Sequence, residues 1–176
     1  SGYKYQTEND LQSDQFKNFD LSRQYFWDTD TGLWRFAHER SLYISGSLKS
    51  VERPSGQIID LIDVRDDNGE IVHWVDVRGW LKVILLPNGH YQMAFDNVYE
   101  EYDAGWLIFS ITDQTGRVIQ YLRDPVANTV TIQNDQVGFS IVIFYDATRV
   151  IDRIENSTGQ VYRYSYNSNK ILEYVS

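Results

Sequence analysis

Short runs of β-branched and aromatic residues alternate with turn signals from residue 33 to the end of the chain. The runs recur at intervals of about ten residues, a pattern typical of antiparallel hairpins. Most breaks carry a glycine behind a small polar residue, and glycine supplies the positive φ that a tight hairpin turn needs. The pattern predicts an all-β fold with structural turns at Gly69, Gly89, Gly116 and Gly159.

Two runs show how these strands are expected to be buried. From Val72 to Val77 the side chains alternate between two faces, with Trp74 and Asp76 on one of them. The run from Val83 to Leu86 is continuously apolar, which favours a strand covered on both faces. We expect antiparallel hairpin repeats that form a curled sheet, a sandwich or an open barrel.

The first thirty residues differ from the rest. They are polar and rich in Gln, Asn and Asp, with Leu11, Phe16, Phe19 and Leu21 at roughly helical spacing. A short helix and an extended arm fit this stretch equally well. Because a chain of 176 residues can bury a core without covalent staples, we expect an arm or short helix over 1–30 and a single β domain over 31–176.

Residues 102–121 and 145–164 are two copies of one phrase, identical at nine positions that include Tyr102/Tyr145 and Gly116/Gly159. A partial third copy begins at Tyr166. The copies start 43 and 21 residues apart, so the unit has about 21 residues, with one degenerate copy between the first two. We expect Tyr102 and Tyr145 to occupy equivalent positions in equivalent hairpins.

The repeat resembles a known family motif. Each copy has Tyr-Asp, an apolar strand, an Asp/Asn-x-x-Gly turn and a strand that ends in tyrosine, as in Tyr102-Asp103 with Asp113 to Gly116. This is similar to the YD repeat of bacterial Rhs proteins, insecticidal Tc toxin components and animal teneurins, over about residues 76–176. The family usually has Gly-Arg-Leu shortly after Tyr-Asp. This chain has Gly105-Trp106-Leu107 in one copy and Thr148-Arg149-Val150 in the other.

The resemblance implies a role as a scaffold. In those relatives the repeats form a long spiral sheet that closes into a shell around a toxin in the bacterial proteins. The few hairpins of this chain would be either a fragment of a longer array or a compact domain with similar hairpins. Convergence is the other explanation, since hairpin proteins with tyrosine-rich strands and glycine turns approach the same pattern.

Charge narrows the set of partners. The formal net charge is −9, which repels a nucleic-acid backbone, and no apolar run is long enough for a membrane-spanning helix. The acidic residues concentrate in two windows, 60–76 and 96–103, which we interpret as solvated faces. The chain has no cysteine, so its compartment stays open, although the resemblance favours a secreted or cell-surface protein.

Catalytic and metal-binding patterns are weak. The three histidines, His38, His73 and His90, lack helical metal-ligand spacing, and the stretch 28–32 lacks the distal glutamate of a calcium loop. Asp76, Glu101 and Asp103 lie near tryptophans, as a glycosidase pair would. We interpret them as solvated carboxylates with ordinary pKa values. We predict no catalytic residue, no metal site and no cofactor.

Aromatic residues are the better candidates for binding, because flat rings stack on sugars and anchor protein partners. We favour core positions for the tryptophans and expect equivalent, packed environments for the indoles of Gly79-Trp80-Leu81 and Gly105-Trp106-Leu107. The expected function is a non-catalytic β-repeat binding or scaffold module from a toxin-delivery or adhesion system, with a protein or glycan partner. The alternatives are a calycin-like barrel for a small apolar ligand and a carbohydrate-active enzyme. The ligand-binding candidates are Trp34, Trp74, Trp80, Trp106, Tyr102 and Tyr145.

Overall fold

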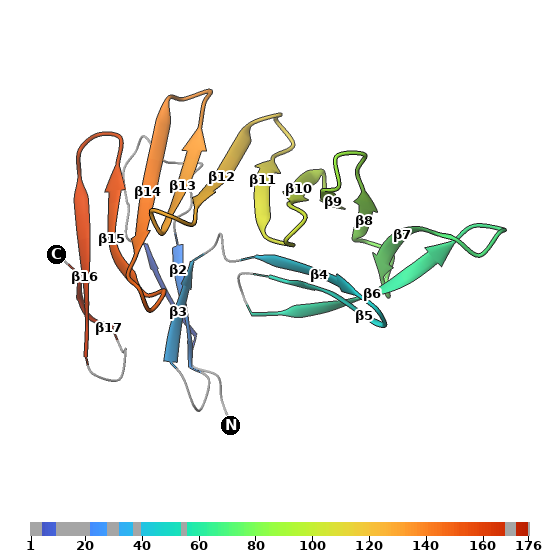
Figure 1. Ribbon diagram of the computed structural model, residues 1–176, viewed down its shortest axis with the longest axis horizontal. Helices are drawn as coiled ribbons and strands as arrows, with labels where there is room; N and C mark the ends of the chain where they lie inside the picture. Colours follow the sequence, from blue (N-terminus) through green and yellow to red (C-terminus); the bar gives the residue numbers. More distant parts are fainter. Residues whose placement is uncertain are drawn as a thin grey trace. The chain divides into compact units, whose positions relative to one another are not determined.

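The computed structural model is all-β, as the sequence predicts, and every described strand pairing is antiparallel (Figure 1). It describes the chain with its side chains over 40–53 and 56–167. At 5–9, 22–27, 32–36 and 172–175 it describes the strand backbone. Strands of four to eight residues joined by turns fit the recurrence of about ten residues seen in the sequence.

The N-terminal strands form a separate three-stranded sheet in the order β1-β2-β3. Within it Tyr5 pairs with Phe26, and Tyr25 pairs with Trp34. Strand structure therefore begins well before residue 33. The helical-spacing residues Leu11, Phe16, Phe19 and Leu21 lie outside the described residues. The three strands are β1 (Tyr5–Asn9), β2 (Ser22–Trp27) and β3 (Gly32–Phe36).

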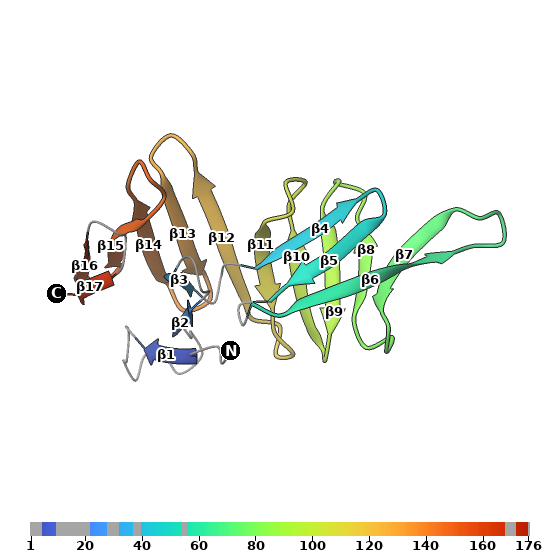
Figure 2. The ribbon, with the colours of Figure 1, turned by 90° about the horizontal axis from the view of Figure 1, so that it is seen from below.

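The remaining strands follow one another in sequence order from β4 to β17, each hydrogen-bonded to the next (Figure 2). Such an order is produced by consecutive hairpins and needs no crossover. The strands are β4 (Ser41–Ser45), β5 (Leu48–Glu52), β6 (Ile58–Arg65), β7 (Ile71–Asp76), β8 (Lys82–Leu85), β9 (Tyr91–Phe95), β10 (Val98–Tyr102), β11 (Ile108–Thr112), β12 (Val118–Asp124), β13 (Thr129–Asn134), β14 (Phe139–Tyr145), β15 (Ile151–Asn156), β16 (Val161–Tyr166) and β17 (Leu172–Val175).

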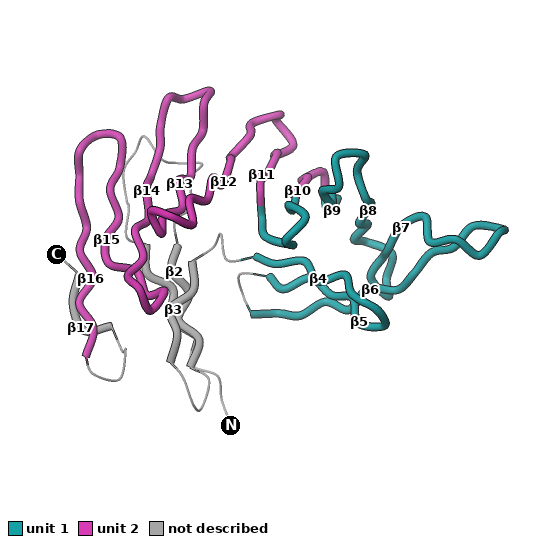
Figure 3. The backbone as a smooth tube through the Cα atoms, in the orientation of Figure 1, with its two compact units in different colours: residues 1–96, 102–108 teal, residues 97–101, 109–176 magenta. Residues whose placement is uncertain are grey.

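The chain divides into two compact units (Figure 3). Unit 1 comprises residues 1–96 and 102–108, and unit 2 comprises residues 97–101 and 109–176. Each unit has buried apolar side chains of its own. Those of unit 1 alternate with exposed residues along β4 to β9, as a sheet with one buried face requires. The buried apolar side chains of unit 1 are Leu42, Val51, Leu61, Trp74, Leu81, Val83, Met93, Tyr102 and Ile108.

Strand β4 of unit 1 also contacts the segment before β11. The Leu42 N–H donates to the Trp106 carbonyl at 3.0 Å, and Ser41 forms a bridge with Leu107. The rings of Tyr43 and Trp106 meet edge to face with centroids 5.0 Å apart. At the far end of β5 the Arg53 guanidinium lies 4.0 Å from the Met93 sulfur. Within unit 1, β4 thus contacts the segment before β11, and β5 contacts β9.

Unit 2 has a regular alternation of buried and half-buried residues. Along β13 and β14 the pairs Val130↔Ile143 and Ile132↔Ile141 face the same side and are almost fully buried. Fully burying an Ile or Val side chain contributes about 1.5–3 kcal/mol, so this row is a main source of stability. The other face is mixed, with Val142 and Phe144 on β14 and polar side chains on β13, where the Gln133 amide donates to Gln120 at 3.0 Å.

The run from Val83 to Leu86 departs from the sequence prediction. Val83 is fully buried, but Ile84 on the opposite face is only half-buried and Leu85 at the strand end is exposed, so this strand is not covered throughout on both faces. The continuous apolar run is explained by its position. Strand β8 ends at Leu85, and Leu86 opens the next turn, where its N–H donates to the His90 carbonyl at 2.7 Å.

Candidate functional site

One turn geometry recurs along the chain and uses most of the repeat's polar residues. The N–H of the first turn residue donates to the carbonyl of the residue four positions later, and its own carbonyl accepts the N–H of the residue three positions later. In the turn at Asp113 these partners are Arg117 and Gly116. The fourth residue has a positive φ, which describes a type I turn followed by a G1 bulge. The four predicted turn glycines all occupy this position, with φ of +84° at Gly69 and Gly89, +81° at Gly116 and +87° at Gly159.

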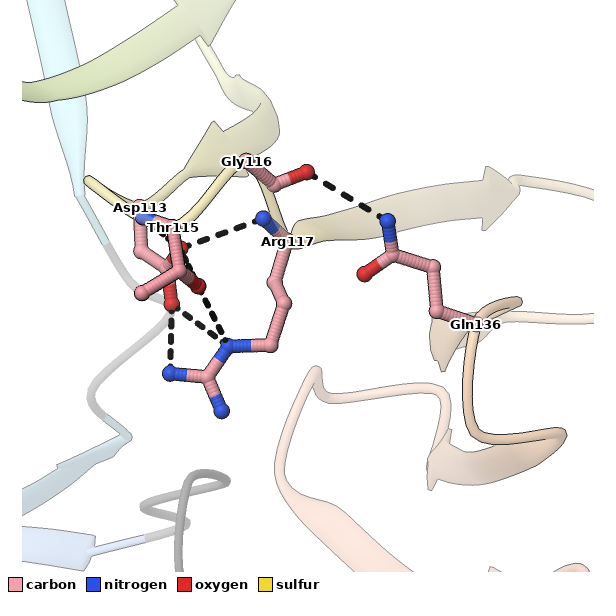
Figure 4. Close-up of polar contacts among 5 residues, drawn as sticks. All are labelled: Asp113, Thr115, Gly116, Arg117 and Gln136. Atoms are coloured by element: carbon pink, nitrogen blue, oxygen red, sulfur yellow. Dashed lines mark hydrogen bonds and ion pairs between the residues drawn. The ribbon is translucent and has the colours of Figure 1, made fainter.

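The first residue of the turn also uses its side chain. Asp113 Oδ1 accepts the N–H groups of Thr115 and Arg117 at 2.8 and 3.1 Å, and the Thr115 hydroxyl donates to it at 2.6 Å (Figure 4). The Arg117 guanidinium forms an ion pair with Oδ2 at 2.7 Å. These donors, led by the Thr115 hydroxyl, lower the pKa of Asp113 to about 2. The carboxylate therefore serves as a structural acceptor.

Asp76, Glu101 and Asp103 do not form the solvated set that the sequence predicted. Asp76 is buried, and its Oδ1 accepts the Leu81 N–H at 2.8 Å. Hydrogen bonds from backbone N–H groups, first that of Leu81, lower the pKa of Asp76, so its predicted ordinary pKa is wrong. Asp103 accepts the N–H groups of Gly105 and Leu107 in the recurring turn. Glu101 is half-buried on β10.

The acidic windows are also less solvated than expected. Glu100 is 1% exposed, although it lies in a window that we interpreted as a solvated face. In the other window Asp63 Oδ1 lies 3.0 Å from the Lys49 ammonium, and Asp63 Oδ2 lies 2.9 Å from the Arg65 guanidinium. The hydrogen bond from Lys49 is the main cause that lowers the pKa of Asp63. A cluster of acidic residues in the sequence does not show which of them are buried, because burial depends on which face of the strand each side chain lies on.

The candidate aromatic residues do not gather at one place. Trp74 and Tyr102 are buried, whereas Trp80 is 66% exposed, with the Arg78 guanidinium 5.1 Å from its ring centroid. Trp106 is half-buried against Tyr43. The expected equivalence of the two Gly-Trp-Leu tripeptides is wrong. Gly79 supplies the positive φ of the first turn, but Trp106 itself, at +68°, supplies it in the second.

The two remaining candidates are Tyr145 on β14 and Trp34 on β3. Tyr145 ends β14 as Tyr102 ends β10, and each precedes an aspartate that opens a turn. Their backbone positions are equivalent, as predicted, but Tyr145 is half-buried and Tyr102 is fully buried. Trp34 lies on the described backbone of β3, and its side chain lies outside the described part of the chain.

Sequence reasoning missed an exposed apolar surface on the β6–β7 hairpin. Buried Leu61 and Trp74 mark one face of this hairpin, and the opposite face carries a stripe of four aliphatic side chains. A signal was present, because the sequence from Ile58 to Val64 has aliphatic residues at both parities, whereas β13 alternates strictly. We name this set the β6–β7 stripe: Ile58, Ile62, Val64 and Val75.

The described residues contain no group of three His, Asp or Glu side chains placed to hold a metal ion. They also contain no helix long and apolar enough to cross a membrane. No family model and no curated protein sequence matches the chain.

Proposed function

We propose that the chain is a non-catalytic β-repeat module that binds a partner through the exposed side chains of its strands, in a secreted or cell-surface setting. One observation carries the proposal. The turn carboxylates accept backbone N–H groups, so they hold the hairpins in shape. Apolar side chains such as Ile58, Ile62 and Trp80 are exposed and have no such structural role.

The pattern of exposure supports a binding role rather than simple packing. Scattered apolar residues on a surface are ordinary, but a contiguous set rimmed by polar residues is typical of an interaction site. The resemblance of residues 76–176 to YD repeats supports a toxin-delivery or adhesion system as the setting. A protein or a glycan partner is consistent with exposed aliphatic and aromatic groups.

An activity screen tests this proposal. The wild type and the variants Asp76→Asn, Glu101→Gln and Asp103→Asn are incubated with a panel of glycan substrates, with circular dichroism to verify the fold. We expect no turnover above background for any of the four proteins. Turnover by the wild type that Asp103→Asn abolishes in a folded protein would replace the binding module with an enzyme.

A further inference from the structure

We propose that the β6–β7 stripe docks an extended segment of a partner protein, with apolar residues on one face and lysine or arginine beside them. This inference rests on the proposed binding function and gives it a site and a partner class. The site lies wholly within unit 1 and consists of described residues.

The hairpin projects beyond its neighbours. The register between β5 and β6 ends at Ser50↔Asp60, and the register between β7 and β8 consists of Trp74↔Val83 and Val75↔Lys82. Residues from Leu61 to His73 therefore pair only with each other within the described strands. Both ribbon views show this hairpin extending past the other turns of unit 1 (Figures 1 and 2).

The apolar side chains are on an accessible face of this hairpin. Ile58 is 65% exposed and Ile62 is 53% exposed. Ile62 pairs with half-buried Val75, and Val64 pairs with His73, so the aliphatic groups adjoin across the two strands. Neighbouring aliphatic side chains on one sheet face form a continuous surface that a partner's side chains can cover.

Exposed apolar side chains occur in both units, but the β12–β13 hairpin of unit 2 carries no comparable stripe. On the corresponding face of β12 and β13, Gln120 pairs with Gln133, and the two side chains are hydrogen-bonded. Leu122 is the exposed aliphatic residue there, and it pairs with Thr131. The stripe is therefore a local feature of β6 and β7 and not a consequence of the repeated hairpin.

Charge around the stripe selects the partner. Three exposed carboxylates, Asp60, Asp67 and Glu70, surround it, together with the turn carboxylate of Asp66. Arg65, Lys49 and Lys82 are cations of this region, and the first two are paired with Asp63. The surplus of negative charge favours lysine or arginine in the partner. It disfavours a second copy of this chain, which would place the same carboxylates against one another.

Neither edge of the projecting hairpin is suited to receive another strand. On β7 the register passes from His73 to Ile71 and leaves Val72 unpaired, so a bulge lies on this strand. On β6 the side chains of Arg65 and Asp63 form an ion pair. Bulges and charged side chains both discourage strand addition at a sheet edge. The partner segment is therefore expected to lie across the stripe itself, with alternate side chains of an extended chain against it.

The test uses a labelled ten-residue peptide in which valine alternates with lysine, and a matched peptide with glutamate in place of lysine. Fluorescence anisotropy gives the Kd of each for the full chain, and the ¹⁵N spectrum locates the bound peptide. Ile62→Thr removes the centre of the stripe. Leu122→Thr is the matched control, because it removes an exposed aliphatic side chain from the equivalent face of β12.

We expect the lysine peptide to bind with spectral changes confined to residues 58–76. Ile62→Thr should raise its Kd about tenfold, as loss of a central apolar anchor does, and Leu122→Thr should leave it unchanged. Equal effects of the two variants, or equal binding of the glutamate peptide, would overturn the proposal. So would absence of binding by the lysine peptide, or wild-type dimerisation that Ile62→Thr abolishes.

The outcome is separable from that of the proposed function. Spectral changes outside residues 58–76 that Ile62→Thr does not alter would reject the stripe and leave a binding module. Glycan turnover in the activity screen would reject the module itself.

Discussion

The two copies of the repeat have the same backbone and different side-chain environments. Strands β11 and β15 begin at Ile108 and Ile151, and strands β12 and β16 begin at Val118 and Val161, so both pairs keep the 43-residue offset. The turns between them open at Asp113 and at Asn156 with the same hydrogen bonds. The two copies therefore share a hydrogen-bond acceptor at the first turn position and a positive φ at the fourth, and these features define the hairpin although the surrounding side chains differ.

The tyrosines that open the two copies offer the largest contrast. Tyr102 is fully buried in unit 1, so Tyr102→Ala should lower the free energy of unfolding by about 3–5 kcal/mol. Tyr145 is half-buried, and Tyr145→Ala should cost about 1–2 kcal/mol. Urea denaturation measures both. Equal losses would mean that the two environments do not differ as the structure describes.

Glycine at the fourth turn position is the next contrast. Gly116→Val and Gly159→Val should each lower the free energy of unfolding by about 1–3 kcal/mol, because a β-branched residue is strained at positive φ. Gly116→Asn is the control, since asparagine tolerates this conformation better. A valine variant as stable as the asparagine variant would show that the backbone there is not left-handed in solution.

The turns at Asp113 and Asn156 should differ in how their contribution to stability depends on pH. The folded pKa of Asp113 is about 2, below its ordinary value of 3.8, so the stability contributed by its ionised form is present above pH 3.8 and is lost as the pH falls toward 2. Asp113→Asn should flatten the dependence of unfolding free energy on pH in this range. Asn156→Asp should steepen it. Chemical denaturation at a series of pH values checks both, and parallel profiles for all three proteins would be the opposing result.

The hairpins and their turn glycines were predictable because strand period, turn composition and repetition are local properties. The burial of Asp76 and Glu100 was not, because it depends on which face of a strand is covered. Trp106 shows a second limit. The pattern Gly-Trp-Leu aligned it with Trp80, but the turn begins at Asp103, and Trp106 falls on the left-handed position.

The candidate binding surface was the least predictable part. The sequence has aliphatic residues at both parities of β6, but it does not tell which face is covered, since Ile62 lies beside buried Leu61. Ile58 is 65% exposed although it pairs with Glu52 of β5, so strand pairing does not decide the exposure. The exposure depends on which face of the hairpin other elements cover, and no local pattern reports that.

A reciprocal exchange at the fourth turn position tests most directly whether backbone conformation defines the repeated turn. Arg149 has a φ of +63°, and Gly116 holds the same position in its own turn. Arg149→Gly should raise the free energy of unfolding by about 0.5–1 kcal/mol, because relief of the strained arginine exceeds the entropy cost of glycine. Gly116→Arg should lower it by about 1–2 kcal/mol. Changes of opposite sign are the predicted result, and a loss of stability on Arg149→Gly would contradict it.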